Sequence, residues 1–251
     1  MVPRTPVAAG ALGLGLGLGL AACTASPPAK TTPGVCAGVQ AVSILRSQCG
    51  ATADFTPVNR YRGEFTVVDA REDAVALIGG DCTGTLIAAA AGPVVLTAGH
   101  CVGLGDRSLV AFNVEDDPDG DQLFTGGTVI ERADAPDYAL IQLDALPAVV
   151  PTALSTRASD RLVVIQHPRG GHKVVAEGDY LDACHDEMFY GDLDTLVGSS
   201  GAGVLSRTGA LVAVHSDGDC ATDGSGANHG STAASIVAAS AYLVDADIAD
   251  R

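Results

Sequence analysis

Three short segments carry side chains that could act together in nucleophilic catalysis. His100 lies in TAGHC, Asp137 opens the alternating segment DYALIQL, and Ser200 lies in VGSSGAG. A histidine can accept a proton near neutral pH, a carboxylate can hold the imidazole in one tautomer, and an activated serine can attack a carbonyl carbon. The backbone N–H groups of Gly198 and Ser200 could stabilise the resulting oxyanion. These residue types therefore predict hydrolysis of an acyl bond.

The carboxylate has a competitor. Asp134 precedes Asp137 by three residues and is either a turn residue or the true partner of the histidine. The alternation of the strand that follows favours Asp137. We expect Asp137 to orient His100, and Asp134 remains an alternative.

Short strands must hold these residues. Many segments are rich in Val, Ile and Thr, mostly shorter than about eight residues, and separated by turn residues. Examples are EFTVVDA, AVALIGG, SLVAFNV, RLVVIQHP and GALVAVHSDG. This spacing predicts an all-β barrel or sandwich. The Ala-rich residues 231–250 have apolar side chains at helical intervals and predict one C-terminal helix.

The segments and their order resemble the trypsin-like serine peptidases of the chymotrypsin fold, especially a bacterial branch with Gly-x-Ser-Gly at the serine. The resemblance runs from about residue 60 to about residue 240. It rests on CTGTLI, LTAGHC, DYALIQL, QHPRGG, DTLVGSSG and VAVHSDG. It implies two antiparallel six-stranded β-barrels with the site between them, and we expect the C-terminal helix to pack onto these barrels.

The resemblance also implies a role for each residue of the site. His100 would be the general base, Asp137 its partner and Ser200 the nucleophile. Gly198 and Ser200 would form the oxyanion hole. Ser199, the rival serine, occupies the place of a structural aspartate in the family.

Three residues correspond to the family's S1 pocket. Asp194, six residues before Ser200, would lie at the base of the pocket and predicts Lys or Arg at P1. His215, with Thr195 nearby, is instead similar to glutamate-specific relatives. A third hypothesis is that Asp194 and His215 neutralise each other and leave a pocket for small or apolar side chains. All three remain open, with the basic P1 first.

The cysteines indicate an oxidising compartment. There are seven in total, and setting Cys23 aside leaves six, which is enough for three disulfides. The resemblance implies two pairs, and a third remains by subtraction. The expected pairs are Cys82–Cys101, Cys184–Cys220 and Cys36–Cys49.

The N-terminus has the pattern of an export signal. Arg4 precedes an apolar run from Val7 to Ala22, which is short for a membrane span of roughly 20 residues. Leu-Ala-Ala-Cys at residues 20–23 resembles the lipobox of bacterial lipoproteins, which implies cleavage before Cys23 and a lipid on its sulfur. TASPPAKTTPG then has the composition of a tether. We expect an exported protein, lipid-anchored at the cell envelope or surface, or extracellular without the lipid.

Charge limits the partners. A net charge of −16 disfavours nucleic acid. The loop NVEDDPDGDQ, which includes Glu115 and Asp121, could in principle bind calcium, but Pro118 breaks the EF-hand pattern and a solvated turn is more common. We expect no metal or other cofactor, a monomer, and no membrane contact beyond the lipid.

These observations predict four parts. They are a signal peptide (1–22), a tether and N-terminal segment (23–55), a first barrel (56–150), and a second barrel with the helix (151–251). The predicted function is a serine endopeptidase that forms an acyl-enzyme. The alternative is a non-catalytic lipoprotein that binds peptides or proteins. In that case the oxyanion turn would be collapsed around Ala202 and Gly203, where the family commonly has a stiffening proline.

Overall fold

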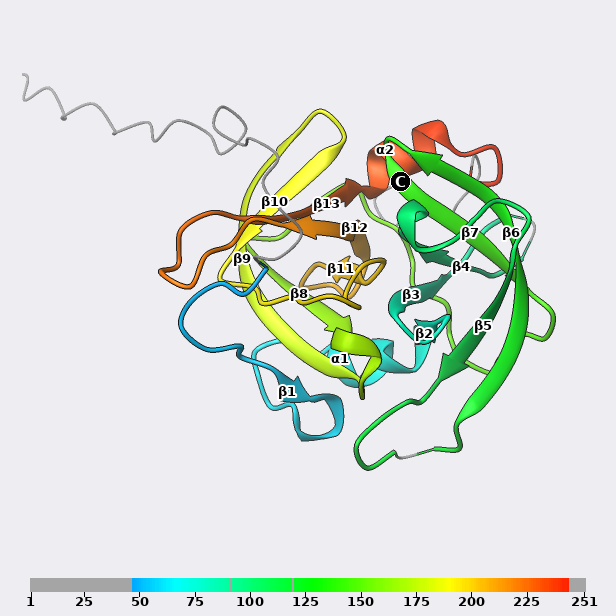
Figure 1. Cartoon of the computed structure of the whole chain (residues 1–251), viewed down its shortest axis with the longest axis horizontal. Helices are drawn as coiled ribbons and strands as arrows, with labels where there is room; N and C mark the ends of the chain where they lie inside the picture. Colours follow the sequence, from blue (N-terminus) through cyan, green and yellow to red (C-terminus); the bar gives the residue numbers. More distant parts are fainter. Residues whose placement is uncertain (1–46, 91, 119, 244–251) are drawn as a thin grey trace, which may run out of the picture. The chain divides into compact units, whose positions relative to one another are not determined.

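The computed structural model describes residues 47–243, apart from residues 91 and 119. Within this part of the chain the strands form two closed, six-stranded antiparallel barrels (Figure 1). The first has the order β2-β3-β4-β7-β6-β5, and the second closes through β8, β9, β10, β13, β12 and β11. The expected two-barrel fold is confirmed.

The first barrel contains β2 (Val75–Ile78), β3 (Cys82–Ile87), β4 (Val94–Thr97), β5 (Arg107–Phe112), β6 (Leu123–Asp134) and β7 (Asp137–Leu143). The second contains β8 (Arg161–Gln166), β9 (Val174–Cys184), β10 (Glu187–Gly191), β11 (Gly203–Leu205), β12 (Leu211–Gly218) and β13 (Asn228–Thr232). The other elements among the described residues are β1 (Thr56–Pro57), α1 (Val68–Arg71), α2 (Ala233–Ala239) and the 3-10 helices η2 (Val58–Arg60), η3 (Glu72–Ala74), η4 (Gly99–Cys101) and η5 (Pro168–Gly170).

Several strands are apolar on both faces, because each face packs on a different core. Successive side chains of a strand point to opposite faces. In β4, Val95 packs inside the first barrel, whereas its neighbour Leu96 packs in a core shared with the second barrel. In β3, Leu86 and Ile87 divide in the same way. The unbroken apolar runs therefore fix the two barrels against each other as well as filling the first one.

The residues before the first barrel pack on the second barrel. We call residues 47–57 the strap. Its last two residues form β1, which pairs with β9, and the Ser47 carbonyl accepts a hydrogen bond from the Thr195 N–H (3.1 Å). The strap therefore belongs structurally with the second barrel, although Thr56 is the first residue of the range predicted for the first.

Because of the strap, the observed disulfide pattern differs from the predicted one. The expected Cys82–Cys101 bond is present. Cys220, however, pairs with Cys49 of the strap across 171 residues, so the predicted Cys184–Cys220 and Cys36–Cys49 pairs are wrong. The strap brings the Cα atoms of Cys49 and Cys220 to 4.8 Å. Cys184 is also disulfide-bonded, whereas Cys23 and Cys36 lie outside the described residues.

The predicted C-terminal helix is present but begins later than the pattern indicated. Ser231 and Thr232 still belong to β13, and α2 begins at Ala233. The Thr232 side chain accepts a hydrogen bond from the Ser235 N–H and so caps the helix. Ile236 of α2 is fully buried in the shared core. The helix ends at Ala239, earlier than the pattern indicated, and residues 244–250 of the predicted stretch lie outside the described residues.

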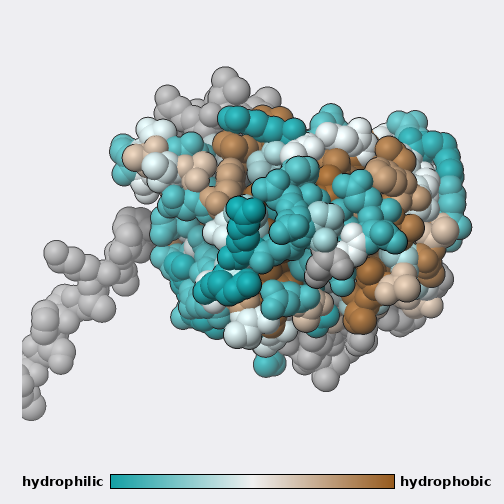
Figure 2. All heavy atoms as spheres, turned by 90° about the horizontal axis from the view of Figure 1, so that it is seen from below, coloured by the Kyte–Doolittle hydropathy of each residue, from teal (hydrophilic) through white to brown (hydrophobic). Residues whose placement is uncertain are grey.

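The surface of the protein carries both hydrophilic and hydrophobic residues. Figure 2 shows hydrophilic residues over much of one face, with hydrophobic residues gathered in places. Exposed apolar side chains include Leu109 and Phe124 on the paired strands β5 and β6. Among the described residues, no helix is long and apolar enough to cross a membrane.

Candidate active site

His100 lies on η4, directly after β4, where close packing fixes the backbone. A Cβ on Gly99 would lie 2.2 Å from the Ala133 carbonyl oxygen, so only glycine fits beside the β6–β7 hairpin. The Arg132 guanidinium donates hydrogen bonds to the carbonyls of Gly99 (2.8 Å) and Val102 (3.1 Å). The short helix is therefore bound to the hairpin that carries the candidate carboxylate.

Asp137 is the carboxylate that contacts the histidine. Its Oδ2 lies 2.7 Å from His100 Nδ1, and its Oδ1 accepts the His100 backbone N–H at 3.0 Å. The hydrogen bond with Asp137 raises the pKa of His100 above its ordinary value. Asp134, the competing carboxylate, instead accepts a hydrogen bond from Arg132 (2.6 Å). Of the two carboxylates, the structure therefore pairs Asp137 with His100.

The two adjacent serines have different surroundings. Ser199 is fully buried, and its Oγ accepts a hydrogen bond from the Leu196 N–H (3.0 Å), which closes the turn. Ser200 is half-buried and lines the same cavity as His100. Ser200 is thus the serine that is placed to meet a substrate.

The backbone around Ser200 turns its carbonyl groups toward protein donors. The carbonyls of Leu196 and Ser199 accept N–H groups within the turn, and that of Val197 accepts the Arg169 N–H. The carbonyls of Gly198 and Ser200 are bound by Thr83. By contrast, neither the Gly198 N–H nor the Ser200 N–H has a hydrogen-bond partner among the described residues. Two free donors beside a serine are what an oxyanion hole requires.

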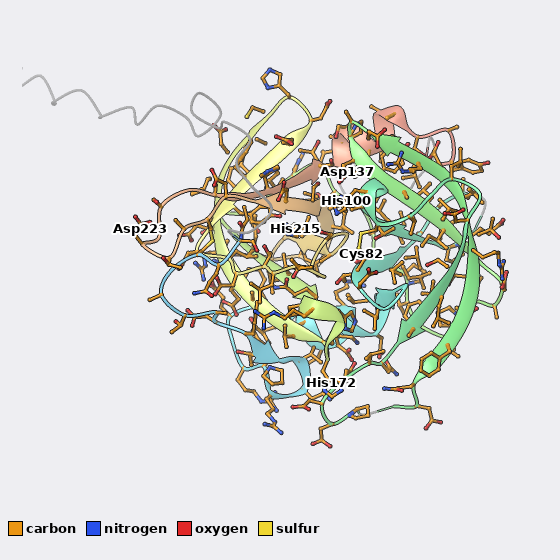
Figure 3. The ribbon with its side chains drawn as sticks, in the orientation of Figure 1. Cys82, His100, Asp137, His172, His215 and Asp223 are labelled. Carbon is orange, nitrogen blue, oxygen red and sulfur yellow. A yellow bond between two sulfur atoms is a disulfide. The ribbon has the colours of Figure 1, made fainter. Side chains whose placement is uncertain are left out.

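A cavity of about 930 Å³ brings these groups together. His100 and Asp137 come from the first barrel, and Gly198, Ser200 and His215 from the second. Figure 3 shows His100 beside Asp137, with His215 and Cys82 in the same central region and His172 well away from them. The cavity therefore lies where the two barrels meet, as expected.

The three predicted S1 residues do not share one role. The Asp194 carboxylate accepts the backbone N–H groups of Cys49 (2.7 Å) and Asp54 (2.5 Å) of the strap. It is buried and is not among the residues that line the cavity. Burial raises its pKa. Thr195 is fully buried and does not line the cavity either.

His215 does line the cavity. Its Nδ1 lies 2.5 Å from the Tyr190 hydroxyl, and burial lowers its pKa to about 3. The imidazole is therefore uncharged at neutral pH. It therefore cannot attract a substrate by charge.

Several residues that line the cavity were not singled out by the sequence analysis, and Ser47 and Asp217 are two of them. Ser47 of the strap forms part of the wall, although residues 23–55 read only as a tether and N-terminal segment. Asp217, two residues after His215, also lines the cavity, and its charge helps to raise the pKa of His100. No local signal marks Ser47, because its place depends on a disulfide and hydrogen bonds to residues far along the chain.

The acidic loop after β5 has a structural contact. Glu115 turns inward and binds Lys173 (2.5 Å). Among residues 47–243, leaving aside 91 and 119, there is no group of three or more His, Cys, Asp or Glu side chains that could hold a metal ion.

A two-barrel fold with a His–Asp pair, a serine and free N–H donors in the shared cavity is the architecture of the chymotrypsin-fold serine proteases. A family model described as a trypsin-like peptidase domain matches residues 82–214, slightly more than half of the chain. The chain belongs to this trypsin-like peptidase family, and is accordingly a serine endopeptidase. No curated protein matches the sequence significantly.

Solved structures support the fold. The active form of the Rv3671c protease of M. tuberculosis has 18% identity and a TM-score of 0.58, with 82% of this chain and 92% of that chain covered. The MamO protease domain of Magnetospirillum magneticum has 14% identity and a TM-score of 0.54, covering 67% and 96%. A serine endoprotease of Yersinia pestis has 14% identity and a TM-score of 0.56, covering 69% and 64%.

Proposed function

We propose that the protein hydrolyses peptide bonds through an acyl-enzyme, with Ser200 as nucleophile, His100 as general base and Asp137 as the residue that orients it. The observation that carries the proposal is the hydrogen bond between His100 Nδ1 and Asp137 in the cavity that Ser200 lines. Asp137 holds the proton on Nδ1, so Nε2 is left unprotonated and able to accept a proton.

The reaction then follows from the placement of these groups. His100 Nε2 takes the Ser200 proton as Oγ attacks the carbonyl carbon, and the Gly198 and Ser200 N–H groups bind the oxyanion. The imidazolium next protonates the leaving amine. Water, activated by the same histidine, hydrolyses the ester and restores the serine. Only protein groups and water take part.

A fluorophosphonate probe tests the assignment. We expect one covalent adduct on the wild-type protein, measured by intact mass, and none on Ser200→Ala. Ser199→Ala is the matched control and should keep the adduct, because Ser199 Oγ serves the turn. An adduct that persists in Ser200→Ala would overturn the assignment. A folded wild-type protein without an adduct would favour the binding lipoprotein.

For the P1 side chain, we propose recognition by His215. The hypothesis of a basic P1 required a free Asp194 carboxylate, but both its oxygens accept strap N–H groups. Although acidic side chains such as Asp186, Glu187 and Asp217 line the same cavity, a direct hydrogen bond from the His215 imidazole to a substrate carboxylate would favour glutamate at P1. A P1 peptide library should therefore rank Glu above Lys and Arg. A preference for Lys or Arg that disappears in Asp194→Asn would restore the original hypothesis.

We also propose export and lipid attachment at Cys23, a residue outside the described part of the chain. Disulfides among the described residues are consistent with folding in an oxidising compartment. In cells fed a labelled fatty acid, the wild-type protein should carry label and partition into detergent, whereas Cys23→Ser should not. Equal partitioning of both forms would exclude the anchor.

A further inference from the structure

Thr83 connects the two residues of the candidate oxyanion hole to a neighbouring turn. Its N–H donates to the Ser200 carbonyl (2.9 Å), and its Oγ1 donates to the Gly198 carbonyl (2.8 Å). The same Oγ1 accepts the His167 N–H (3.0 Å). Thr83 is fully buried, so water cannot replace these hydrogen bonds.

The neighbouring turn fixes the peptide that carries the first oxyanion donor. The Arg169 N–H, in η5, donates to the Val197 carbonyl (2.5 Å). Within one peptide group the C=O and N–H point in opposite directions, so this bond aims the Gly198 N–H away from η5. A Cβ on Gly198 would lie 2.6 Å from the Arg169 nitrogen. The close approach therefore requires glycine.

The same glycine also allows the Val197–Gly198 peptide to rotate easily. Gly198 has a φ of +96°, and a residue without a Cβ can adopt many other backbone conformations. Rotation of the Val197–Gly198 peptide would replace the donor with a carbonyl oxygen. Hydrogen bonds from outside residues 196–200 must therefore keep the Gly198 backbone in its observed conformation.

We propose that Thr83 is a positioning residue for catalysis. Its hydroxyl joins the Gly198–Ser199 peptide to the His167–Gly171 turn and so keeps the oxyanion donors oriented. Thr83 belongs to β3 of the first barrel, whereas Gly198 and His167 belong to the second. Its carbonyl accepts the Thr97 hydroxyl (2.7 Å), which secures it within its own barrel. The oxyanion hole is thus fixed across the contact between the barrels. This inference rests on the proposed function.

The test removes the hydroxyl while keeping the shape of the side chain. Thr83→Val loses the bonds to Gly198 and His167, and Thr83→Ser keeps a hydroxyl. Thr85→Val is the matched control, because Thr85 lies on the same strand, is also buried, and its hydroxyl has no hydrogen-bond partner among the described residues. The probes are p-nitrophenyl acetate, for kcat and KM, and diisopropyl fluorophosphate, for the rate of adduct formation at Ser200.

We expect Thr83→Val to lower kcat by about 10- to 100-fold with KM changed less than about threefold, since loss of one oxyanion donor costs on the order of 10²-fold or more. The rate of adduct formation should fall in parallel. Thr83→Ser should recover most of both rates, and Thr85→Val should resemble the wild type.

Each other outcome has a distinct meaning. If Thr83→Val behaves as Thr85→Val does while wild-type Ser200 reacts, the positioning role is wrong and the proposed function stands. If wild-type Ser200 does not react, the proposed function fails and the inference with it. Circular dichroism checks folding, and Thr83→Ala replaces Thr83→Val if the valine is not accommodated.

Discussion

At the scale of single residues, the proposed general base His100 determines the pH dependence that we expect of the enzyme. Only the neutral imidazole can accept the proton of Ser200. The hydrogen bond with Asp137 favours the protonated form and raises the pKa of His100 above 6.5. Activity should therefore be absent at acidic pH and appear as the pH rises through the elevated pKa.

We predict that kcat/KM measured against pH rises with an inflection above 6.5. In Asp137→Asn the inflection should move to lower pH, because the partner that stabilises the imidazolium is gone. The maximum should fall by on the order of 10⁴-fold, as expected when the tautomer is no longer controlled. Asp134→Asn, three residues away, should leave the inflection in place. An unchanged inflection in Asp137→Asn would contradict the pairing.

Sequence reasoning worked best at this scale where the signal was local. TAGHC and DYALIQL predicted that His100 and Asp137 are partners, and the two side chains are hydrogen-bonded in the structure. Such a prediction is possible because alternation along a strand is a local property. The role predicted for Asp194 has no support in the described contacts, because its neighbours come from the strap. No sequence signal distinguished Thr83. A threonine in an apolar strand looks the same in sequence whether its hydroxyl is hydrogen-bonded, as in Thr83, or has no partner among the described residues, as in Thr85.

At the scale of elements, the strap is the part that sequence patterns missed. Its composition gave no sign of a fixed position. Three kinds of contact hold it: the Cys49–Cys220 disulfide, the hydrogen bonds to Asp194, and the pairing of β1 with β9. Each joins residues more than 100 positions apart, and periodicity cannot reveal such pairs. The strands of both barrels, by contrast, followed from short Val- and Ile-rich runs.

We predict that Cys49→Ala with Cys220→Ala lowers the free energy of unfolding by about 2–5 kcal/mol, because a long loop is no longer closed. KM for peptides should rise as well, since Ser47 in the cavity wall is held by the same strap. Chemical denaturation and steady-state kinetics measure the two effects. Thr52→Ala, in the exposed middle of the strap, should change neither. A normal KM in the double variant would show that the hydrogen bonds alone keep the wall in place.

At the scale of the whole molecule, a buried charge joins the barrels on the side of the strap. Lys173, just before β9, has no exposed surface. Its Nζ lies 2.5 Å from carboxylate oxygens of Glu72 and Glu115, which belong to the first-barrel half of the chain. Burial raises the pKa of Glu72 to about 8. Although burial opposes its charge, Glu115 keeps a lowered pKa because Lys173 binds it. The cluster therefore contains an ion pair between Lys173 and Glu115, and burial favours the protonated form of Glu72.

We predict that Lys173→Met lowers the free energy of unfolding by about 3–5 kcal/mol at neutral pH, since it leaves the Glu115 charge buried without a partner. The loss should shrink at acidic pH, because Glu115 then takes up a proton. Adding Glu115→Gln should recover part of the stability. Arg107→Met, which breaks an exposed ion pair with Asp144, should leave stability nearly unchanged. Denaturation curves at several pH values decide between these outcomes.

The strap also bears on where the protein acts. Ser47 forms part of the cavity wall and is joined through the chain to Cys23. If Cys23 carries lipid, the anchor is therefore attached to the protein at the wall of the substrate cavity. A substrate held at the envelope would then meet the cavity at a higher effective concentration than one that diffuses freely.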